Sequence, residues 1–340
     1  MTIKDVFKKA KETIGPHCKV CPECNGVACR GQIPGPGGKG TGLGFIRNYK
    51  DLKKISLNMD TIYEPGRPDT SVELFGKKFD LPVFAGPVGA VQMHYSDLYT
   101  DLTYNECVLN GCKDIGTLAF TGDGVNDAVY EGAIEAIKGI DGFGIPTIKP
   151  WKKEEVIKKI KMAEKAGAVA VAMDIDTAGL AILAAQGKPV SPVSTETLKE
   201  IVASTKLPLI LKGIMTVEGA KKALKSGASG IVVSNHGGRV LDETPSTISK
   251  LGEIVHAVGG QLTILIDGGF RSGIDVFKAL ALGADGVLIA RPYTAAVYGG
   301  DVEGVRLYTQ KIQQELADAM LMTGCHTIKE ITMNKVTIEG

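Results

Sequence analysis

Three stretches of the sequence repeat one pattern, in which a helical run ends at a glycine and a short apolar run follows. The stretches are AEKAGAVAVAMDIDT, ALKSGASGIVVSNHG and ALALGADGVLIARP, and their glycines are Gly167, Gly227 and Gly283. Glycine suits the left-handed residue that commonly ends a helix, and the apolar run has the length of a strand. Because strands that are apolar on both faces belong in a parallel sheet covered by helices, the pattern predicts repeated helix-to-strand units.

The rest of the chain extends this pattern to eight strands. Besides the three above, strands are expected over 81–86, 113–120, 143–149, 207–213 and 262–269. Helical patterns occupy 95–111, 125–138, 152–166, 194–204, 216–226, 245–258, 272–282 and 302–323. Alternating strands and helices over about 240 residues predict a (β/α)8 TIM barrel, with an open doubly wound sheet as the alternative. We expect residues 76–340 to form the barrel and residues 1–75 to form an amino-terminal extension.

Composition excludes several classes of function. With 39 basic and 38 acidic residues the net charge is +1, which provides no field to attract nucleic acid. No run of 18 apolar residues is present, so no membrane span is expected. The start, MTIKDVFKKAKETIG, lacks the apolar core of a secretory signal, and we expect a cytoplasmic protein that acts on a small molecule.

Polar side chains follow nearly every predicted strand. In a barrel of this kind the chemistry sits at the carboxyl ends of the strands, so these residues form the candidate site. For any one of them a surface charge is the simpler interpretation, but so many together favour a site. They are Lys149, Asp174, Asp176, Lys212, Ser234, His236, Arg239, Asp267, Arg271 and Arg291.

Two neighbouring strand ends indicate a phosphate site. IDGGFRSGIDVFKAL runs from a strand through Gly268 and Gly269 into a helix, and LIARPYTAAVYGG repeats the arrangement one unit later. Glycines let backbone amides approach an anion, a helix amino end favours negative charge, and Arg271 and Arg291 add charged donors. The loops after strands seven and eight are the usual phosphate site of these barrels, so a phosphate-bearing ligand is expected.

The stretch 207–333 resembles the FMN-dependent α-hydroxy acid oxidases and dehydrogenases, the family of glycolate and lactate oxidases. SNHGGR at 234–239, followed by DGGFR at 267–271 and MLMTGCHTIKEI near the end, carries the resemblance, which is weaker across 75–180. It implies oxidation of a small 2-hydroxy acid to the 2-oxo acid, with FMN as cofactor and oxygen or another carrier as electron acceptor. It also implies a homo-oligomer, often a tetramer.

The same resemblance implies roles for individual residues. His236 is then the base that takes a proton from the substrate, Asp176 pairs with it, and Lys212 lies beside the flavin ring. Arg239 clamps the substrate carboxylate. Asp267 holds the ribityl chain, and Gly269, Arg271 and Arg291 hold the phosphate. The remaining expected cofactor contacts are Pro87, Val88, Gly89, Thr117, Ser234, Gly237, Gly268 and Ala290.

The sequence also departs from that family. The family has a tyrosine at the end of strand three, where this chain has PTIKPW, and an arginine after the strand-four aspartate, where DTAGLAILAAQG has none. We interpret Lys149 as the residue that binds the substrate anion in place of the missing tyrosine and arginine. The alternative interpretation is a solvated lysine at the end of a strand. Two other functions therefore stay open: an FMN barrel of isopentenyl diphosphate isomerase type, and a flavin and metal redox module.

HCKVCPECNGVACRG contains a compact cysteine motif before the glycine-rich PGPGGKGTGLG. Cys18, Cys21, Cys24 and Cys29 follow the spacing C-x2-C-x2-C-x4-C, which lets four thiolates face one zinc ion or iron–sulfur cluster. Free, redox-active thiols are the alternative. The glycine-rich stretch is either a flexible loop or a segment that closes over the mouth of the barrel.

Overall fold

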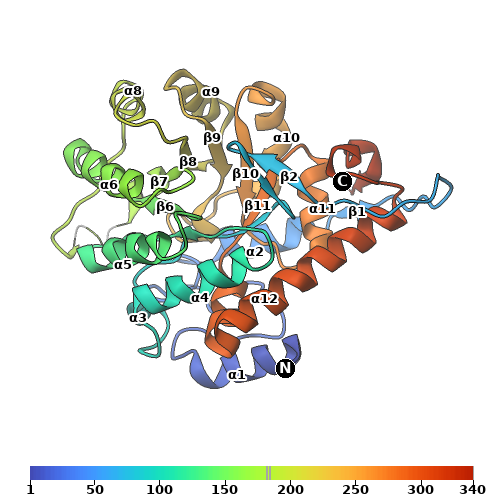
Figure 1. The fold of residues 1–340 in the computed structure, drawn as a ribbon, viewed down its shortest axis with the longest axis horizontal. Coiled ribbons are helices and arrows are strands. Elements are labelled where there is room, and N and C mark those ends of the chain that lie inside the picture. Colours follow the sequence, from blue (N-terminus) through green and yellow to red (C-terminus); the bar gives the residue numbers. More distant parts are fainter. Residues whose placement is uncertain (181–182, 184, 340) are drawn as a thin grey trace.

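The structure is a computed structural model that describes residues 1–180, 183 and 185–339. Among these residues the central sheet has eight parallel strands in the order β4-β11-β10-β9-β8-β7-β6-β5 (Figure 1). An additional parallel bridge between Ala85 and Ala119 joins the two end strands and closes the sheet. The TIM barrel is therefore confirmed, and the open doubly wound sheet is wrong. The strands are β4 (Val83–Ala85), β5 (Phe120–Thr121), β6 (Ile145–Ile148), β7 (Val171–Asp174), β8 (Leu209–Ile214), β9 (Gly230–Val233), β10 (Thr263–Asp267) and β11 (Gly286–Ile289).

Helices alternate with these strands and surround the barrel (Figure 1). Hydroxyl side chains such as Ser194 and Ser246 cap their amino ends, and Gly167, Gly227 and Gly283 all have positive φ, as predicted for helix ends. The helices are α4 (Asp101–Lys113), α5 (Asp127–Lys138), α6 (Lys153–Lys165), α8 (Thr195–Ala203), α9 (Val217–Lys225), α10 (Thr247–Val258), α11 (Gly273–Ala281) and α12 (Arg291–Met322).

The elements around strand two and the last helix differ from the sequence prediction. The predicted strand 113–120 begins too early, because α4 continues to Lys113 and a tight turn follows it, so that only Phe120–Thr121 pairs as β5. The predicted helix 95–111 begins too early, because Thr100 caps α4 and residues 95–100 are not helical; the short helix α3 (Val91–His94) before them was not predicted. Helix α12 is interrupted at Gly300 and Asp301, whose φ and ψ are not helical, so the predicted helix 302–323 is its second part; the first part, from Arg291, was not predicted.

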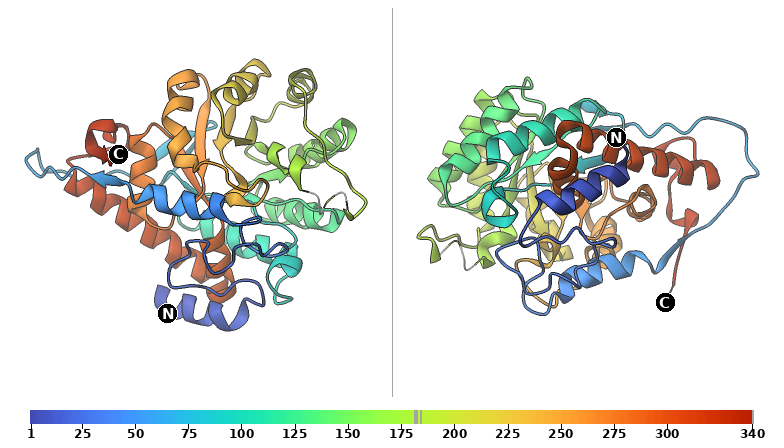
Figure 2. Two further views of the ribbon diagram at one scale, coloured as in Figure 1. Left: turned by 180° about the vertical axis from the view of Figure 1, so that it is seen from behind. Right: turned by 90° about the horizontal axis from the view of Figure 1, so that it is seen from below.

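The first 80 residues cover two parts of the barrel. Helix α1 (Ile3–Thr13) packs along α12, and α2 (Leu43–Leu52) packs against α10 (Figure 2). An irregular dark-blue segment, residues 14–42, connects α1 to α2 in Figure 2. Strand β1 (Ile55–Leu57) pairs with β12 (Val336–Ile338), and β2 (Val72–Leu74) pairs with β3 (Lys77–Phe79). The division of the chain at residue 75 stays a prediction.

The core has two layers. Leucine, isoleucine, valine and alanine side chains fill the space between the barrel and its helices. A second cluster fills the barrel interior and includes Phe79, Phe84 and Phe120. Across the described residues, none of the helices is both long and apolar enough to cross a membrane.

Candidate active site

A cavity of about 430 Å³ opens at the carboxyl ends of the strands, a size typical of small-molecule sites. Its walls combine apolar residues such as Met93 and Leu183 with charged side chains from several strand ends. Most of the predicted site residues line it, as a barrel requires. They are Pro87, Val88, Gly89, Lys149, Asp174, Lys212, His236, Gly237, Arg239, Asp267, Gly268, Gly269, Arg271, Ala290 and Arg291.

Three predicted residues do not line the cavity. Asp176 and Ser234 lie directly behind it, where both contact His236: the Ser234 hydroxyl accepts a hydrogen bond from its backbone N–H. The structure corrects the prediction that Thr117 contacts the cofactor. Thr117 precedes β5, and its buried hydroxyl donates to the Val83 carbonyl at the start of β4. This places Thr117 at the amino end of the strands, away from the cavity.

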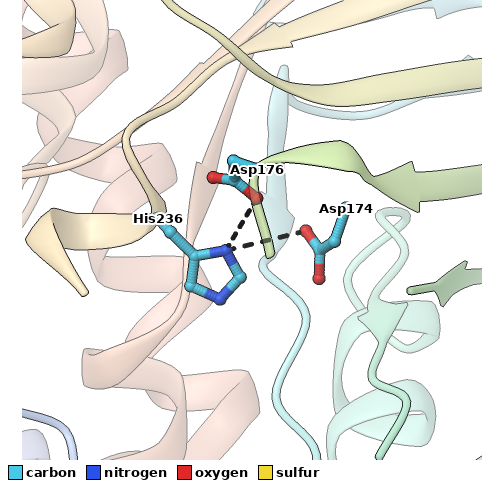
Figure 3. Close-up of side chains that lie close together, drawn as sticks. All are labelled: Asp174, Asp176 and His236. Carbon is cyan, nitrogen blue, oxygen red and sulfur yellow. Dashed lines mark hydrogen bonds and ion pairs between the residues drawn. The ribbon is translucent and has the colours of Figure 1, made fainter. Parts of the chain in front are cut away.

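His236 lies just after β9, at the start of a short 3-10 turn with a left-handed φ of +56°. Its Nδ1 is 3.1 Å from Asp176 Oδ1 and 3.9 Å from Asp174 Oδ1 (Figure 3). Asp174 ends β7, and the 3-10 turn that follows it, Ile175–Gly179, brings Asp176 to the imidazole. A strained residue held in one conformation at a strand end is typical of a functional site.

Lys212 is the cation at the centre of this cluster. Its Nζ lies 2.9 Å from Asp174 Oδ1, 3.6 Å from Asp267 Oδ2 and 3.5 Å from His236 Nδ1. The side chain is almost fully buried in the barrel and is therefore fixed by these partners. Asp174, Asp176 and His236 are close enough together to hold a metal ion. An ammonium group 2.9 Å from Asp174 already supplies the positive charge there, which argues against a metal.

Burial and the neighbouring charges set the protonation of this cluster. Burial, reinforced by Lys212, lowers the pKa of His236 well below its usual value, so the imidazole is neutral at neutral pH. Burial raises the pKa of Asp176. Burial acts in the same direction on Asp174, but the neighbouring Lys212, His236 and Lys149 together outweigh it and lower the pKa of Asp174. A neutral imidazole facing a cavity is available to accept a proton.

The irregular segment 14–42 closes one side of the cavity. Arg239 Nη2 donates to the Gly35 carbonyl at 3.0 Å, and Arg291 Nε donates to the Pro36 carbonyl at 2.7 Å. Gly35 and Pro36 themselves line the cavity. Of the two interpretations of PGPGGKGTGLG, the structure therefore favours the segment that covers the barrel mouth.

The motif cysteines lie beside the phosphate end of the cavity. Arg271 donates to the Cys24 carbonyl from Nε at 3.1 Å and from Nη2 at 2.9 Å, and its Nη2 is 3.5 Å from Cys24 Sγ. Burial raises the pKa of Cys18 to about 11, and the nearby thiols of the motif add to this effect. Whether the motif binds a metal stays a prediction.

Sequence reasoning missed His94 and Asp123, both of which line the cavity. His94 accepts from the Gly35 N–H at 3.0 Å, and burial together with Arg239 lowers its pKa to about 3. It lies on α3, in a stretch that shows no pattern of its own. Asp123 accepts from the Lys149 N–H at 3.0 Å and from Lys159 Nζ at 2.6 Å. The polar TGDG after strand two was the available signal for Asp123.

The residues present fit FMN. Gly268 and Gly269 have φ of +98° and +91°, and a Cβ on Gly269 would lie 2.1 Å from the Asn48 carbonyl oxygen, so only glycine fits this turn. Among the described residues, the buried atoms Asp267 Oδ1 and Arg239 Nε have no hydrogen-bond partner. A buried carboxylate oxygen without a partner at the cavity wall suits a hydroxyl-bearing chain such as ribityl.

Comparisons with known proteins agree with this site. The family described as FMN-dependent dehydrogenase matches residues 36–182 and 180–338. A peroxisomal (S)-2-hydroxyacid oxidase of Arabidopsis thaliana is 38% identical over 328 residues, which cover 86% of this chain and 88% of the relative. The 4-hydroxymandelate oxidase of Amycolatopsis orientalis is 30% identical over 343 residues, which cover 88% of this chain and 93% of the relative.

Solved structures give the same result. A mandelate oxidase variant with 2-hydroxy-phenylacetamide superposes with a TM-score of 0.81 and 28% identity, covering 99% of this chain and 97% of the other. A second variant of mandelate oxidase, which carries a monooxide FMN adduct, superposes with a TM-score of 0.76 and 30% identity, covering 88% of this chain and 93% of the other.

Proposed function

Because this chain belongs to the family of FMN-dependent dehydrogenases, we propose that it oxidises a small 2-hydroxy acid of lactate or glycolate type to the 2-oxo acid, with His236 as the base. One observation carries the proposal: a neutral imidazole, 3.1 Å from a buried carboxylate, faces the same cavity as Arg239. The family match supports oxidation over the isomerase alternative.

His236 and Asp176 work as a pair in this proposal. With Nδ1–H donating to Asp176 Oδ1, Nε2 keeps the lone pair that accepts a proton from the substrate. The imidazolium that forms is positive, and the carboxylates of Asp176 and Asp174, at 3.1 and 3.9 Å, stabilise it. Asp176 is thus the residue that orients the base and holds its charge.

Two cations orient the substrate. Arg239 keeps its Nε without a partner among the described residues, so this donor is available to the substrate carboxylate. Lys149 lines the same cavity, and its backbone N–H is fixed by Asp123. Lys149 therefore replaces part of the carboxylate binding that the tyrosine and arginine of related enzymes would supply.

The remaining charged residues would hold FMN, which, when bound, accepts the two electrons of the substrate. Lys212 supplies positive charge at the cavity floor, where it would stabilise negative charge on the ring. Asp267 would bind the ribityl hydroxyls, and Gly269, Arg271 and Arg291 the phosphate. The electron acceptor, a homo-oligomeric assembly such as a tetramer, and a cytoplasmic location remain part of the proposal.

An anaerobic titration tests the proposal. Purified protein with bound FMN is mixed in turn with lactate, glycolate, mandelate and 2-hydroxyglutarate, and the flavin absorbance near ~450 nm is followed. We expect lactate or glycolate to bleach it. Bleaching by mandelate alone would replace the small-acid proposal with an aromatic substrate. If FMN stays oxidised with every acid, 2-hydroxy acid oxidation at this site is wrong.

A further inference from the structure

No step of the proposed oxidation uses the four cysteines of the amino-terminal motif. All four lie in the irregular segment 14–42, are half-buried and carry free thiols. We propose that Cys18, Cys21, Cys24 and Cys29 bind one [4Fe–4S] cluster beside the arginines at the phosphate end of the cavity. This inference does not depend on the substrate of the enzyme.

The spacing of the motif suits a cluster. The first three cysteines follow C-x2-C-x2-C, the spacing at which bacterial ferredoxins supply three ligands to one [4Fe–4S] cluster. The fourth cysteine follows after four residues. All four cysteines lie within twelve residues of one irregular segment, so their thiols belong to the same loop.

The distances between the sulfurs distinguish a cluster from a single metal ion. One tetrahedral zinc with Zn–S bonds of about 2.3 Å requires its sulfurs to be about 3.8 Å apart. Within the described part of the chain, no three of the cysteine sulfurs lie within 4.8 Å of one another. A four-iron core is larger than one ion and holds its four thiolates farther apart. The described sulfurs are therefore not gathered as a single zinc ion requires, and we assign the motif to the larger cluster.

Positive charge surrounds the motif. Arg271 Nη2 is 3.5 Å from Cys24 Sγ, and Arg291 Nε donates to the Pro36 carbonyl of the same segment at 2.7 Å. Both guanidinium groups lie near the Phe45 ring, with Arg291 Cζ 3.8 Å and Arg271 Cζ 5.8 Å from its centroid. Four thiolates around an iron–sulfur core make an anion, and two fixed arginines compensate its charge.

The segment that carries the motif has no regular secondary structure. Within the described residues, 14–42 has no helix and no strand and is held by scattered hydrogen bonds, such as Gly31 N–H to the Gly38 carbonyl and Lys39 N–H to the Gly238 carbonyl, so a cluster would add a strong cross-link to it. The wrapping is nevertheless tight: a Cβ on Gly37 would lie 2.0 Å from the Cys29 carbonyl oxygen. Because the Pro36 carbonyl binds Arg291, a cluster would also anchor the cover of the cavity.

Metal analysis of the full-length chain tests the inference. After anaerobic purification, with no substrate added, we expect about four iron and four acid-labile sulfide per chain, and an EPR signal after reduction with dithionite. Cys21→Ser should lose the iron and bind FMN less tightly. Cys107→Ser, a half-buried cysteine on α4 outside the motif, should keep both.

Other outcomes would overturn the cluster. One zinc per chain without sulfide would make the motif a zinc site. A disulfide between two motif cysteines, with no metal, would make it a thiol switch. Failure to take up iron during anaerobic incubation with ferrous iron, sulfide and dithiothreitol would also exclude it. These results count metal on substrate-free protein, so they are independent of whether a 2-hydroxy acid reduces the flavin.

Discussion

The two ends of the barrel interior differ in chemistry. Toward the amino ends of the strands the interior is filled by apolar side chains, with Phe84 packed between Phe79 and Phe120 at ring-centroid distances of 5.2 and 6.3 Å. At the carboxyl ends it holds Lys212 among buried carboxylates, together with His236. The same eight strands thus contribute apolar packing at their amino ends and buried charged side chains at their carboxyl ends.

The two ends therefore contribute to different properties of the protein: the apolar end to stability and the polar end to function. Aromatic packing contributes to folding without any partner, because burial of apolar area is favourable in itself. A cluster of buried charges is costly to desolvate and is retained where chemistry needs it. Substitutions at the two ends should therefore change different measured quantities.

The largest expected effect is on catalysis, at the polar end. His236→Ala should reduce the rate of flavin reduction by 2-hydroxy acid about 10²- to 10⁴-fold, because the proton loses its acceptor. Stopped-flow absorbance measures this rate, and thermal unfolding checks stability. His256→Ala, an exposed histidine on α10, is the control and should keep the wild-type rate. An unchanged rate in His236→Ala would show that another group is the base.

The next effect is on stability, at the apolar end. Phe84→Ala should lower the free energy of unfolding by about 3–5 kcal/mol, because it leaves a cavity among buried rings. Denaturant unfolding measures the loss, and the rate of flavin reduction should stay near that of the wild type. A large loss of rate with intact stability would contradict the division between the two ends.

A smaller effect is expected at the substrate carboxylate. Arg239→Met should lower kcat/KM about 10- to 100-fold for lactate, since a charge-assisted hydrogen bond is worth about 1.5–3 kcal/mol. Lactamide, which lacks the carboxylate, serves as the matched substrate and should show little change. Equal losses for the two substrates would mean that Arg239 positions FMN or the cover of the cavity instead.

The smallest effect concerns pH. Since the pKa of His236 is lowered, its neutral form is present at neutral pH, and flavin reduction should decline only as pH falls through that lowered pKa. Lys149 contributes to the lowering, so Lys149→Met should move the acid limb of the rate profile to higher pH. Lys149→Arg keeps the charge and should leave the limb in place. If the acid limb of the Lys149→Met profile stays in place, Lys149 does not lower the pKa of His236.

The repeated units of the barrel could be predicted from local sequence. Helix caps, the glycines at helix ends and apolar strand runs are short-range signals, so most element boundaries agree with the structure within two residues. The region between β4 and β5 was harder to predict. There α3 and the turn after α4 depend on packing against the barrel, and the placement of Thr117 was wrong for the same reason.

The sequence by itself determined the barrel, its polar carboxyl end and the glycine turns for phosphate, because each is encoded in adjacent residues. Tertiary structure alone decided that Asp176 meets His236, that His94 and Asp123 join the cavity, and that Pro36 reaches Arg291. Those contacts join residues far apart in the chain. Closure of the barrel and the path of segment 14–42 bring these residues together. Neither feature produces a periodic pattern of residues from which the contacts could be predicted.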